Sequence, residues 1–114
     1  MKKFIFAFPK EDYERYSALI YTRRTRVISE IEELLKEKDP NEWFSLFSLL
    51  CEYVSVLYHF ENALEEVPLR GEWDDDKNYW LLKEQFASRM AIYISSEEIS
   101  RSHLLSHNIS FVSH

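Results

Sequence analysis

Residues 40–67 read PNEWFSLFSLLCEYVSVLYHFENALEEV and join a strong helix start to an almost continuous apolar surface. Asp39 supplies an N-cap, and Pro40 occupies the first helical position, where its missing N–H costs nothing. The polar residues step by three and four along one narrow stripe, and the rest of the circumference is apolar. Such a helix is surrounded by other elements. Residues 40–67 are therefore predicted to form the central core helix, ended by Pro68, with the polar stripe facing solvent or a polar seam.

Helical periodicity also marks the segment before this helix. Residues 10–38 place apolar side chains at a spacing of three or four, which predicts one long amphipathic helix. Arg24 occupies a position in that stripe where an apolar residue is expected. We interpret Arg24 as a side chain whose stem packs on the protein while its charged head reaches water.

Two shorter helices are predicted after Pro68. Asp74, Asp75 and Asp76 resemble a helix N-terminus, and apolar residues at helical spacing follow up to about Ile94. The sequence Ser95-Ser96-Glu97-Glu98 has the form of a second capping box. It predicts a separate fourth helix that ends near Asn108.

The ends of the chain have the character of strands. Residues 3–8 are rich in Phe and stop at Pro9, and residues 109–112 alternate weakly between apolar and polar. The predicted fold class is therefore all-α. It is a four-helix assembly with a long central apolar helix and a minor two-stranded ribbon joining the termini, forming a single helical domain over residues 1–114.

Composition narrows the classes of function. The 114 residues carry a net charge of −6, which disfavours direct nucleic-acid binding and favours basic partners. The only glycine, Gly71, argues against a phosphate-binding loop, and the single Cys51 excludes an internal disulfide. The apolar run at residues 4–8 is too short for an export signal, and no uninterrupted apolar run reaches the length of a membrane span. We expect a cytoplasmic protein that does not enter the membrane.

Acidic residues gather around the one clear loop of the sequence, residues 69–74. An exposed aromatic ringed by carboxylates suits docking to a basic protein surface, because the ring anchors the contact while the charges raise the on-rate. In the competing interpretation the aspartates stabilise a helix N-terminus and the Trp folds back on the protein. The partner-binding residues predicted here are Glu65, Glu66, Glu72, Trp73, Asp74, Asp75 and Asp76.

A second pattern lies near the C-terminus, in the sequence Arg101-Ser102-His103-Leu104-Leu105-Ser106-His107. An arginine followed after four to six residues by a histidine resembles the motif of the HEPN family of all-helical ribonucleases. The polar residue usual just after the arginine is here a serine. The resemblance implies that Arg101 binds phosphate and that His107 performs acid–base catalysis.

Metal and cofactor binding are not predicted. His103 and His107 stand at i, i+4 and can face one ion, but nothing in the sequence marks a third ligand. No cysteine pair is present, and no acidic residue stands at the offset of a His-Glu-x-x-His site. We therefore predict no metal and no cofactor.

Three functional hypotheses follow. The leading one is a small, acidic, non-catalytic protein that binds and inhibits or neutralises a basic protein partner, as immunity proteins and phage-encoded inhibitors do. The first alternative is a HEPN-like ribonuclease or an inactive relative of one. The second alternative is an oligomeric module, such as a homodimer, whose apolar ends are buried between subunits: Phe4, Phe6, Phe8 and Phe111.

Overall fold

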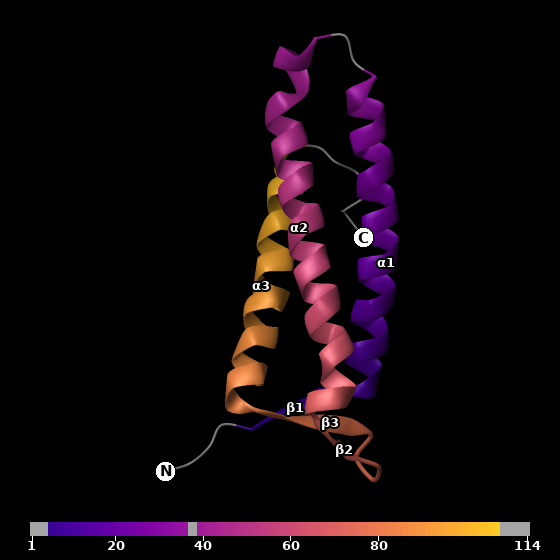
Figure 1. Ribbon diagram of the computed structural model, residues 1–114, viewed down its shortest axis with the longest axis vertical. Helices are drawn as coiled ribbons and strands as arrows, with labels where there is room; N and C mark the ends of the chain where they lie inside the picture. Colours follow the sequence, from indigo (N-terminus) through magenta and orange to yellow (C-terminus); the bar gives the residue numbers. More distant parts are fainter. Residues whose placement is uncertain (1–4, 37–38, 108–114) are drawn as a thin grey trace.

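The computed structural model describes residues 5–36 and 39–107, and these form three helices and one small antiparallel sheet. In chain order the elements are β1 (Ile5–Pro9), α1 (Lys10–Leu35), α2 (Pro40–Arg70), β2 (Glu72–Asp74), β3 (Tyr79–Lys83) and α3 (Glu84–Ser106). The helices run side by side, and the sheet closes one end of the bundle (Figure 1). The molecule is elongated, with principal extents of 56 × 27 × 21 Å.

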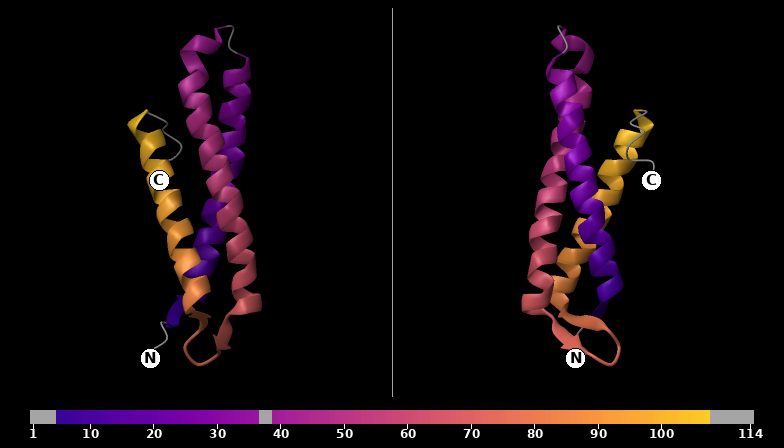
Figure 2. Two further views of the ribbon diagram at one scale, coloured as in Figure 1. Left: turned by 60° about the vertical axis from the view of Figure 1, so that its left-hand side comes forward. Right: turned by 90° about the vertical axis from the view of Figure 1, so that its right-hand side faces the viewer.

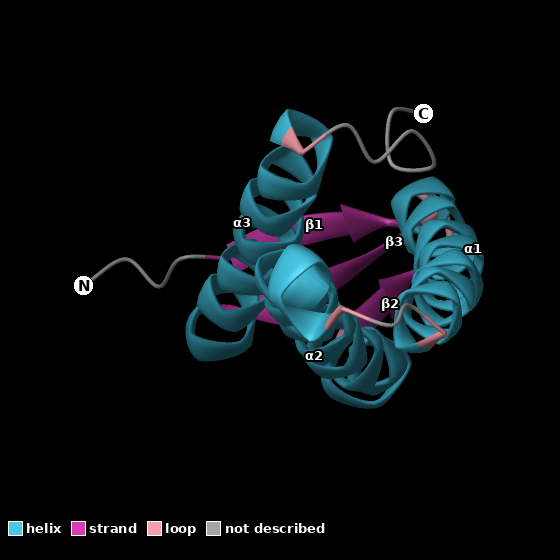
Figure 3. Cartoon of the chain, turned by 90° about the horizontal axis from the view of Figure 1, so that it is seen from above, coloured by secondary structure: helices cyan, strands magenta, loops and turns pink. Residues whose placement is uncertain are grey.

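Helix α2 is the core helix that the sequence predicts. It packs against both α1 and α3, and it contributes a series of fully buried side chains: Leu50, Tyr53, Leu57, Phe60 and Val67. Seen along the bundle axis, α1 and α3 flank α2 above the sheet (Figure 3). Most of its polar stripe faces solvent, as at Glu52 and His59. The helix continues through Pro68 to Arg70, because a proline near the end of a helix removes only a terminal hydrogen bond.

The segment that follows corrects the prediction of a helix opened by Asp74–Asp76. These residues belong to a β-hairpin, in which β2 pairs antiparallel with β3. The Asp74 carboxylate accepts a hydrogen bond from the backbone N–H of Lys77 at 3.1 Å, and Asn78 has a φ of 60°. Aspartate caps turns and helix N-termini with the same side-chain oxygen, and Asn tolerates the left-handed conformation. The local pattern therefore suits both structures.

The prediction of a fourth helix beginning at Ser95 is also wrong. Helix α3 runs without a break from Glu84 to Ser106, so the assembly has three helices among the described residues. The apparent capping box lies in the middle of α3. Serine costs only a few tenths of a kcal/mol inside a helix. Glu97, which a capping box would use at the helix end, instead points into the bundle and is 2% exposed.

The N-terminal strand is present, and within residues 5–36 and 39–107 its partner is β3. Strand β1 pairs with β3, with Phe8 opposite Trp80 and Phe6 opposite Leu82. Phe8 is fully buried against the helices and contacts the ring of Phe6. Phe8 therefore belongs to the core of this chain. The predicted tail strand 109–112, together with Phe4 and Phe111, lies outside the described residues.

One described helix is long and apolar enough to cross a membrane by length and composition alone, the Trp43–Arg70 part of α2. The core helix of a soluble protein has the same composition, because both are apolar around most of their circumference. The expectation that the protein does not enter the membrane stays a prediction.

Candidate functional site

A row of three aromatic rings crosses the sheet end of the molecule. Trp73 on the edge strand β2 lies opposite Trp80 on β3, and their ring centroids are 4.7 Å apart. Trp80 in turn lies 5.1 Å from the ring of Tyr13, which comes from the first turns of α1. Large aromatic rings in tilted contact hold one another in place. The row therefore fixes the hairpin against α1 and leaves Trp73 42% exposed at its outer end.

Carboxylates flank this exposed tryptophan in the chain. Asp75 accepts a hydrogen bond from the indole Nε1 of Trp73 at 3.3 Å, and Glu72 and Asp76 are exposed. Glu72 lies on the opposite face of β2 from Trp73, because successive side chains alternate along a strand. Asp74 has a different role, because its side chain and its carbonyl oxygen close the hairpin turn by accepting hydrogen bonds from Lys77 and Asn78. Three of the four acids on the hairpin are therefore available to a partner, and the fourth is structural.

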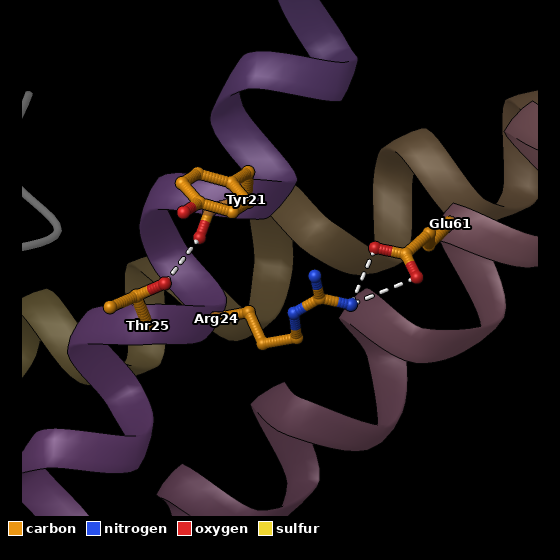
Figure 4. A network of polar contacts seen from close by, with 4 residues as sticks. All are labelled: Tyr21, Arg24, Thr25 and Glu61. Atoms are coloured by element: carbon orange, nitrogen blue, oxygen red, sulfur yellow. Dashed lines mark hydrogen bonds and ion pairs between the residues drawn. The ribbon is translucent and has the colours of Figure 1, made fainter.

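A groove of about 270 Å³ lies between α1 and α2 and shares Tyr13 with the aromatic row. Tyr21 and Glu65 line it, and an ion pair crosses it: Arg24 Nη1 on α1 lies 2.9 Å from Oε1 and 2.7 Å from Oε2 of Glu61 on α2 (Figure 4). The Arg24 head is therefore held by α2 while remaining partly exposed. The full lining is Tyr13, Ser17, Ile20, Tyr21, Arg24, Glu61, Leu64 and Glu65.

The hairpin and the groove are linked through Tyr13, which contacts Trp80 and also lines the groove. We call the two together the acidic aromatic face. It consists of Tyr13, Tyr21, Glu61, Glu65, Glu72, Trp73, Asp75, Asp76 and Trp80. Its tyrosines and tryptophans present ring surface, and its carboxylates supply negative charge, apart from Glu61, whose charge Arg24 compensates. This combination suits the ammonium and guanidinium groups of a partner, through ion pairs and cation–π contacts.

The structure sorts the acids predicted from the sequence into three groups. Glu72, Asp75 and Asp76 are exposed on the hairpin, where Asp75 contacts Trp73, and Glu65 lines the groove between α1 and α2. Asp74 is used in the turn. Glu66 Oε2 lies 3.4 Å from Arg70 Nε and 3.7 Å from Arg89 Nη2, so its charge is compensated within the chain.

Five residues of the site escaped prediction from the sequence: Tyr13, Tyr21, Arg24, Glu61 and Trp80. Tyr13 fits the apolar stripe of residues 10–38, and Trp80 lies in an apolar segment, so both look like ordinary core residues. Arg24 could have been noticed in the sequence, since it interrupts the apolar stripe of α1. The sequence did not show its partner, because Glu61 lies 37 residues further along the chain.

The structure does not bring the two residues of the HEPN-like pattern into one site. Arg101 Nη2 lies 3.4 Å from Oε1 of the buried Glu97, one turn earlier on α3. His107 follows the end of the helix, and its Nδ1 lies 2.9 Å from the carbonyl oxygen of His103, to which it can only donate a hydrogen bond. Arg101 thus has a structural ion pair, while His107 is exposed at the helix terminus. The ribonuclease alternative stays a prediction.

Arg101 belongs to a buried polar cluster that joins α3 to α2. The Tyr53 hydroxyl donates a hydrogen bond of 2.6 Å to Oε2 of Glu97, whose other oxygen faces Arg101. Arg23 on α1 is also buried, and its positive charge acts on Tyr53. Buried charges persist only when they are paired and hydrogen-bonded. We therefore interpret this cluster as a structural element that positions α3.

The alkaline stability of the protein tests this cluster. Burial, and next the hydrogen bond to Glu97, raises the pKa of Tyr53 above its ordinary value. The folded chain then keeps a proton that the unfolded chain releases above its own pKa of about 10. We expect the free energy of unfolding to fall by up to about 1.4 kcal/mol per pH unit from there upward, until the pH reaches the folded-state pKa.

Urea unfolding at a series of alkaline pH values measures this slope. Tyr53→Phe should remove the part of it that Tyr53 contributes, whereas Tyr58→Phe, which changes an exposed tyrosine on the same helix, should leave it unchanged. An identical slope in the wild type and in Tyr53→Phe would contradict the assignment.

No group of three or more His, Cys, Asp or Glu side chains within residues 5–36 and 39–107 is placed to hold a metal ion. The ring of His59 is stacked on the ring of Tyr93, with 6.4 Å between the ring centroids. The carbonyl oxygen of His103 accepts a hydrogen bond from His107.

Comparisons with protein-family models, with curated proteins and with solved structures found no match.

Proposed function

We propose that this protein is a cytoplasmic, non-catalytic binding protein whose acidic aromatic face covers a basic surface of a protein partner. The observation that carries the proposal is the position of Trp73, which is partly exposed, bonded to Asp75 and packed on Trp80, on a hairpin whose other exposed acids are Glu72 and Asp76. Tryptophan is among the residues that most often dominate binding energy at interfaces. Carboxylates around such an anchor attract a basic partner and orient its approach.

The proposed mechanism is occlusion. A basic functional site on the partner, such as one that holds an anionic substrate, would be covered by Trp73 and neutralised by the surrounding carboxylates. This is how immunity proteins and phage-encoded inhibitors act as a class, and we propose the same mode for this chain by physical analogy. The hairpin enters such a contact with little loss of conformational entropy, because its tryptophans are packed before binding.

The partner can be identified by affinity capture. The tagged protein is incubated with lysate of its native cell, and proteins released along a salt gradient are identified by mass spectrometry. We expect one protein in stoichiometric amount, released as the salt concentration rises, because exposed charges are screened within about 3 Å at 1 M salt. Capture of RNA, or of a partner that salt does not release, would contradict the proposal.

A charge-neutralising variant locates the contact on the molecule. Glu72→Gln, Asp75→Asn and Asp76→Asn together remove three negative charges from around Trp73 and leave the turn residue Asp74 in place. We expect the dissociation constant for the captured partner to rise about 20-fold at low salt, mainly through a slower on-rate, and less at high salt. Surface plasmon resonance at two salt concentrations measures both effects.

The matched control removes three exposed charges elsewhere. Glu32→Gln, Glu33→Gln and Glu52→Gln change the net charge by the same amount, but they lie on the outer part of α1 and in the middle of α2. Equal losses of affinity in both triple variants would show that net charge alone attracts the partner, and the acidic aromatic face would lose its assigned role.

A further inference from the structure

The groove between α1 and α2 has two different ends. The two helices run antiparallel and lie side by side (Figure 2). At the end away from the sheet, the ion pair of Arg24 with Glu61 crosses the groove. At the other end stands Tyr13, whose ring contacts Trp80 of the sheet. The groove therefore leads from a neutral ion pair toward the hairpin.

One carboxylate of the groove has no counter-ion among the residues that the structure describes. Glu65 lines the groove one helical turn after Glu61 on α2, and its side chain is exposed. Arg24 compensates Glu61, so the three charged side chains of the lining leave one negative charge, that of Glu65. This charge attracts a cation into the groove.

The rest of the lining suits a cation that carries a hydrocarbon chain. Ile20 and Leu64 are 1% and 3% exposed, so they form an apolar floor beneath the charges. Tyr21 is exposed and forms a wall beside Arg24 (Figure 4). Methylene groups gain contact along an apolar surface while their charged head stays in water, and a tyrosine ring attracts a cation placed over its face.

The volume of the groove limits the size of its occupant. At about 270 Å³ it is smaller than the roughly 300–1,000 Å³ of a typical small-molecule site, so it suits a single side chain. A bare metal ion is a poorer fit, because no group of three or more candidate metal ligands lies within residues 5–36 and 39–107. The occupant that matches both charge and shape is a basic side chain of a protein.

We propose that the groove receives a lysine side chain of the basic partner, with its ammonium group between Glu65 and Ser17. Within the described part of the chain, neither of these side chains makes a hydrogen bond or an ion pair. The two carboxylate oxygens and the hydroxyl supply three acceptors, which equals the three N–H donors of an ammonium group. The five donors of an arginine fork would outnumber them.

This inference rests on the proposed function, because the lysine belongs to the partner. It adds a second anchor to Trp73, and the two are linked through the contacts of Trp80 with Trp73 and with Tyr13. Two anchors fix the orientation of a partner, which attraction between net charges alone does not. The partner is therefore expected to present a lysine beside the surface that Trp73 covers.

Titration with Nα-acetyl-lysine methylamide tests the groove without any partner. We expect binding to the full chain with a dissociation constant of about 1–10 mM, measured by NMR as shifts at Ser17, Tyr21 and Glu65. The Nε-acetylated probe keeps the hydrocarbon chain and loses the charge, so it should bind at least about five-fold more weakly. The corresponding arginine probe should also bind more weakly than the lysine probe.

Two variants of the groove separate its charge from its shape. Glu65→Gln should raise the dissociation constant of the lysine probe about five-fold, whereas Glu52→Gln, an exposed change elsewhere on α2, should leave it unchanged. Ser17→Phe fills the groove without changing its charge and should abolish binding. Its control is Ala18→Phe, at the next exposed position on α1 and outside the groove. Circular dichroism shows whether each variant is folded.

The complex with the captured partner provides a direct readout. A carbodiimide joins a carboxylate to an amine in contact with it, with loss of water, and mass spectrometry of the linked peptides identifies both residues. We expect Glu65 to be linked to a lysine of the partner. Glu65→Gln should remove that link, and both Glu65→Gln and Ser17→Phe should raise the dissociation constant of the complex about 10-fold.

The inference and the proposed function fail in different experiments. A partner whose affinity depends on the hairpin acids, but not on Glu65→Gln or Ser17→Phe, would leave the proposed function standing and remove the lysine from the groove. If no partner is captured, the probe still decides the matter. No binding at about 50 mM lysine probe, or binding that Ser17→Phe leaves unchanged, would overturn the inference. Tighter binding of the arginine probe would overturn the choice of lysine.

Discussion

Glu97→Ala is expected to lower the free energy of unfolding by about 4 kcal/mol, because it removes the common partner of a buried cluster. The Glu97 carboxylate is almost completely inaccessible, accepts the Tyr53 hydroxyl hydrogen bond and faces Arg101. Removing one member of a buried ion pair leaves the remaining charge without compensation. A domain of this size is stable by only about 5–15 kcal/mol, so the loss is a large fraction of the total.

Urea denaturation followed by circular dichroism measures the loss, and Glu98→Ala is the matched control. Glu98 is the next residue on α3 and is exposed, so its replacement should change stability by less than about 0.5 kcal/mol. The loss of stability in Tyr53→Phe should lie between those of the two glutamate variants, since this change removes one hydrogen bond but leaves the ion pair. Equal stabilities of the Glu97 and Glu98 variants would mean that the cluster does not hold α3 in place.

Gly71→Val is expected to destabilise the protein by about 3 kcal/mol, because it forces atoms into a space that is already full. A Cβ atom at Gly71 would lie 2.8 Å from the Val67 carbonyl oxygen and 2.9 Å from the Cβ of Trp80. The backbone of Gly71 has an ordinary φ of −88°, so the reason is close packing and not a special conformation. The end of α2 would have to move away from β3.

The same substitution should disturb the acidic aromatic face, since Trp80 supports Trp73. Tryptophan fluorescence is expected to shift to the red as the indole rings gain contact with water, and affinity for the partner should fall with it. Leu69→Val, two residues earlier and highly exposed, is the control for a valine near the end of α2. A Gly71→Val protein with unchanged stability would contradict the close packing of α2 on β3.

The buried cluster also changes how variants of Arg101 must be interpreted. Arg101→Ala removes a partner of Glu97 and should destabilise the fold, so a loss of any activity in that variant would not identify a catalytic residue. His107 is exposed at the end of α3, and its replacement should leave the fold intact. Only His107 variants can therefore separate catalysis from stability in the ribonuclease alternative.

The elements that the sequence predicted well are those whose local pattern has one solution. Residues 40–67 are apolar around most of a helix, so any compact fold must surround them, and α2 is the central helix. The N-terminal strand is also predicted by local sequence. Its Phe-rich run is short and is bounded by Pro9, which is typical of a strand. The predicted start of α1 coincides with Lys10.

The errors arise where one local pattern suits two structures. The spacing of Tyr79, Leu82 and Phe86 fits a helical face. Tyr79 and Leu82 nevertheless lie on β3, and Phe86 is the first buried residue of α3. Pairing with β1 and β2 decides the outcome. β2 is the other arm of the same hairpin, but β1 comes from the opposite end of the chain. Tertiary pairing overrides local propensity in such segments.

The sequence by itself determined the helical character of the chain, the identity of its core helix and the acidic cluster around Trp73, because periodicity, capping and charge are local properties. Only the tertiary structure decided which of those acids are free, that Arg24 meets Glu61, and that Glu97 is buried beneath Tyr53. These are contacts between residues 37 and 44 positions apart. Which long-range pairs form depends on how the helices pack together, and no local pattern contains that information.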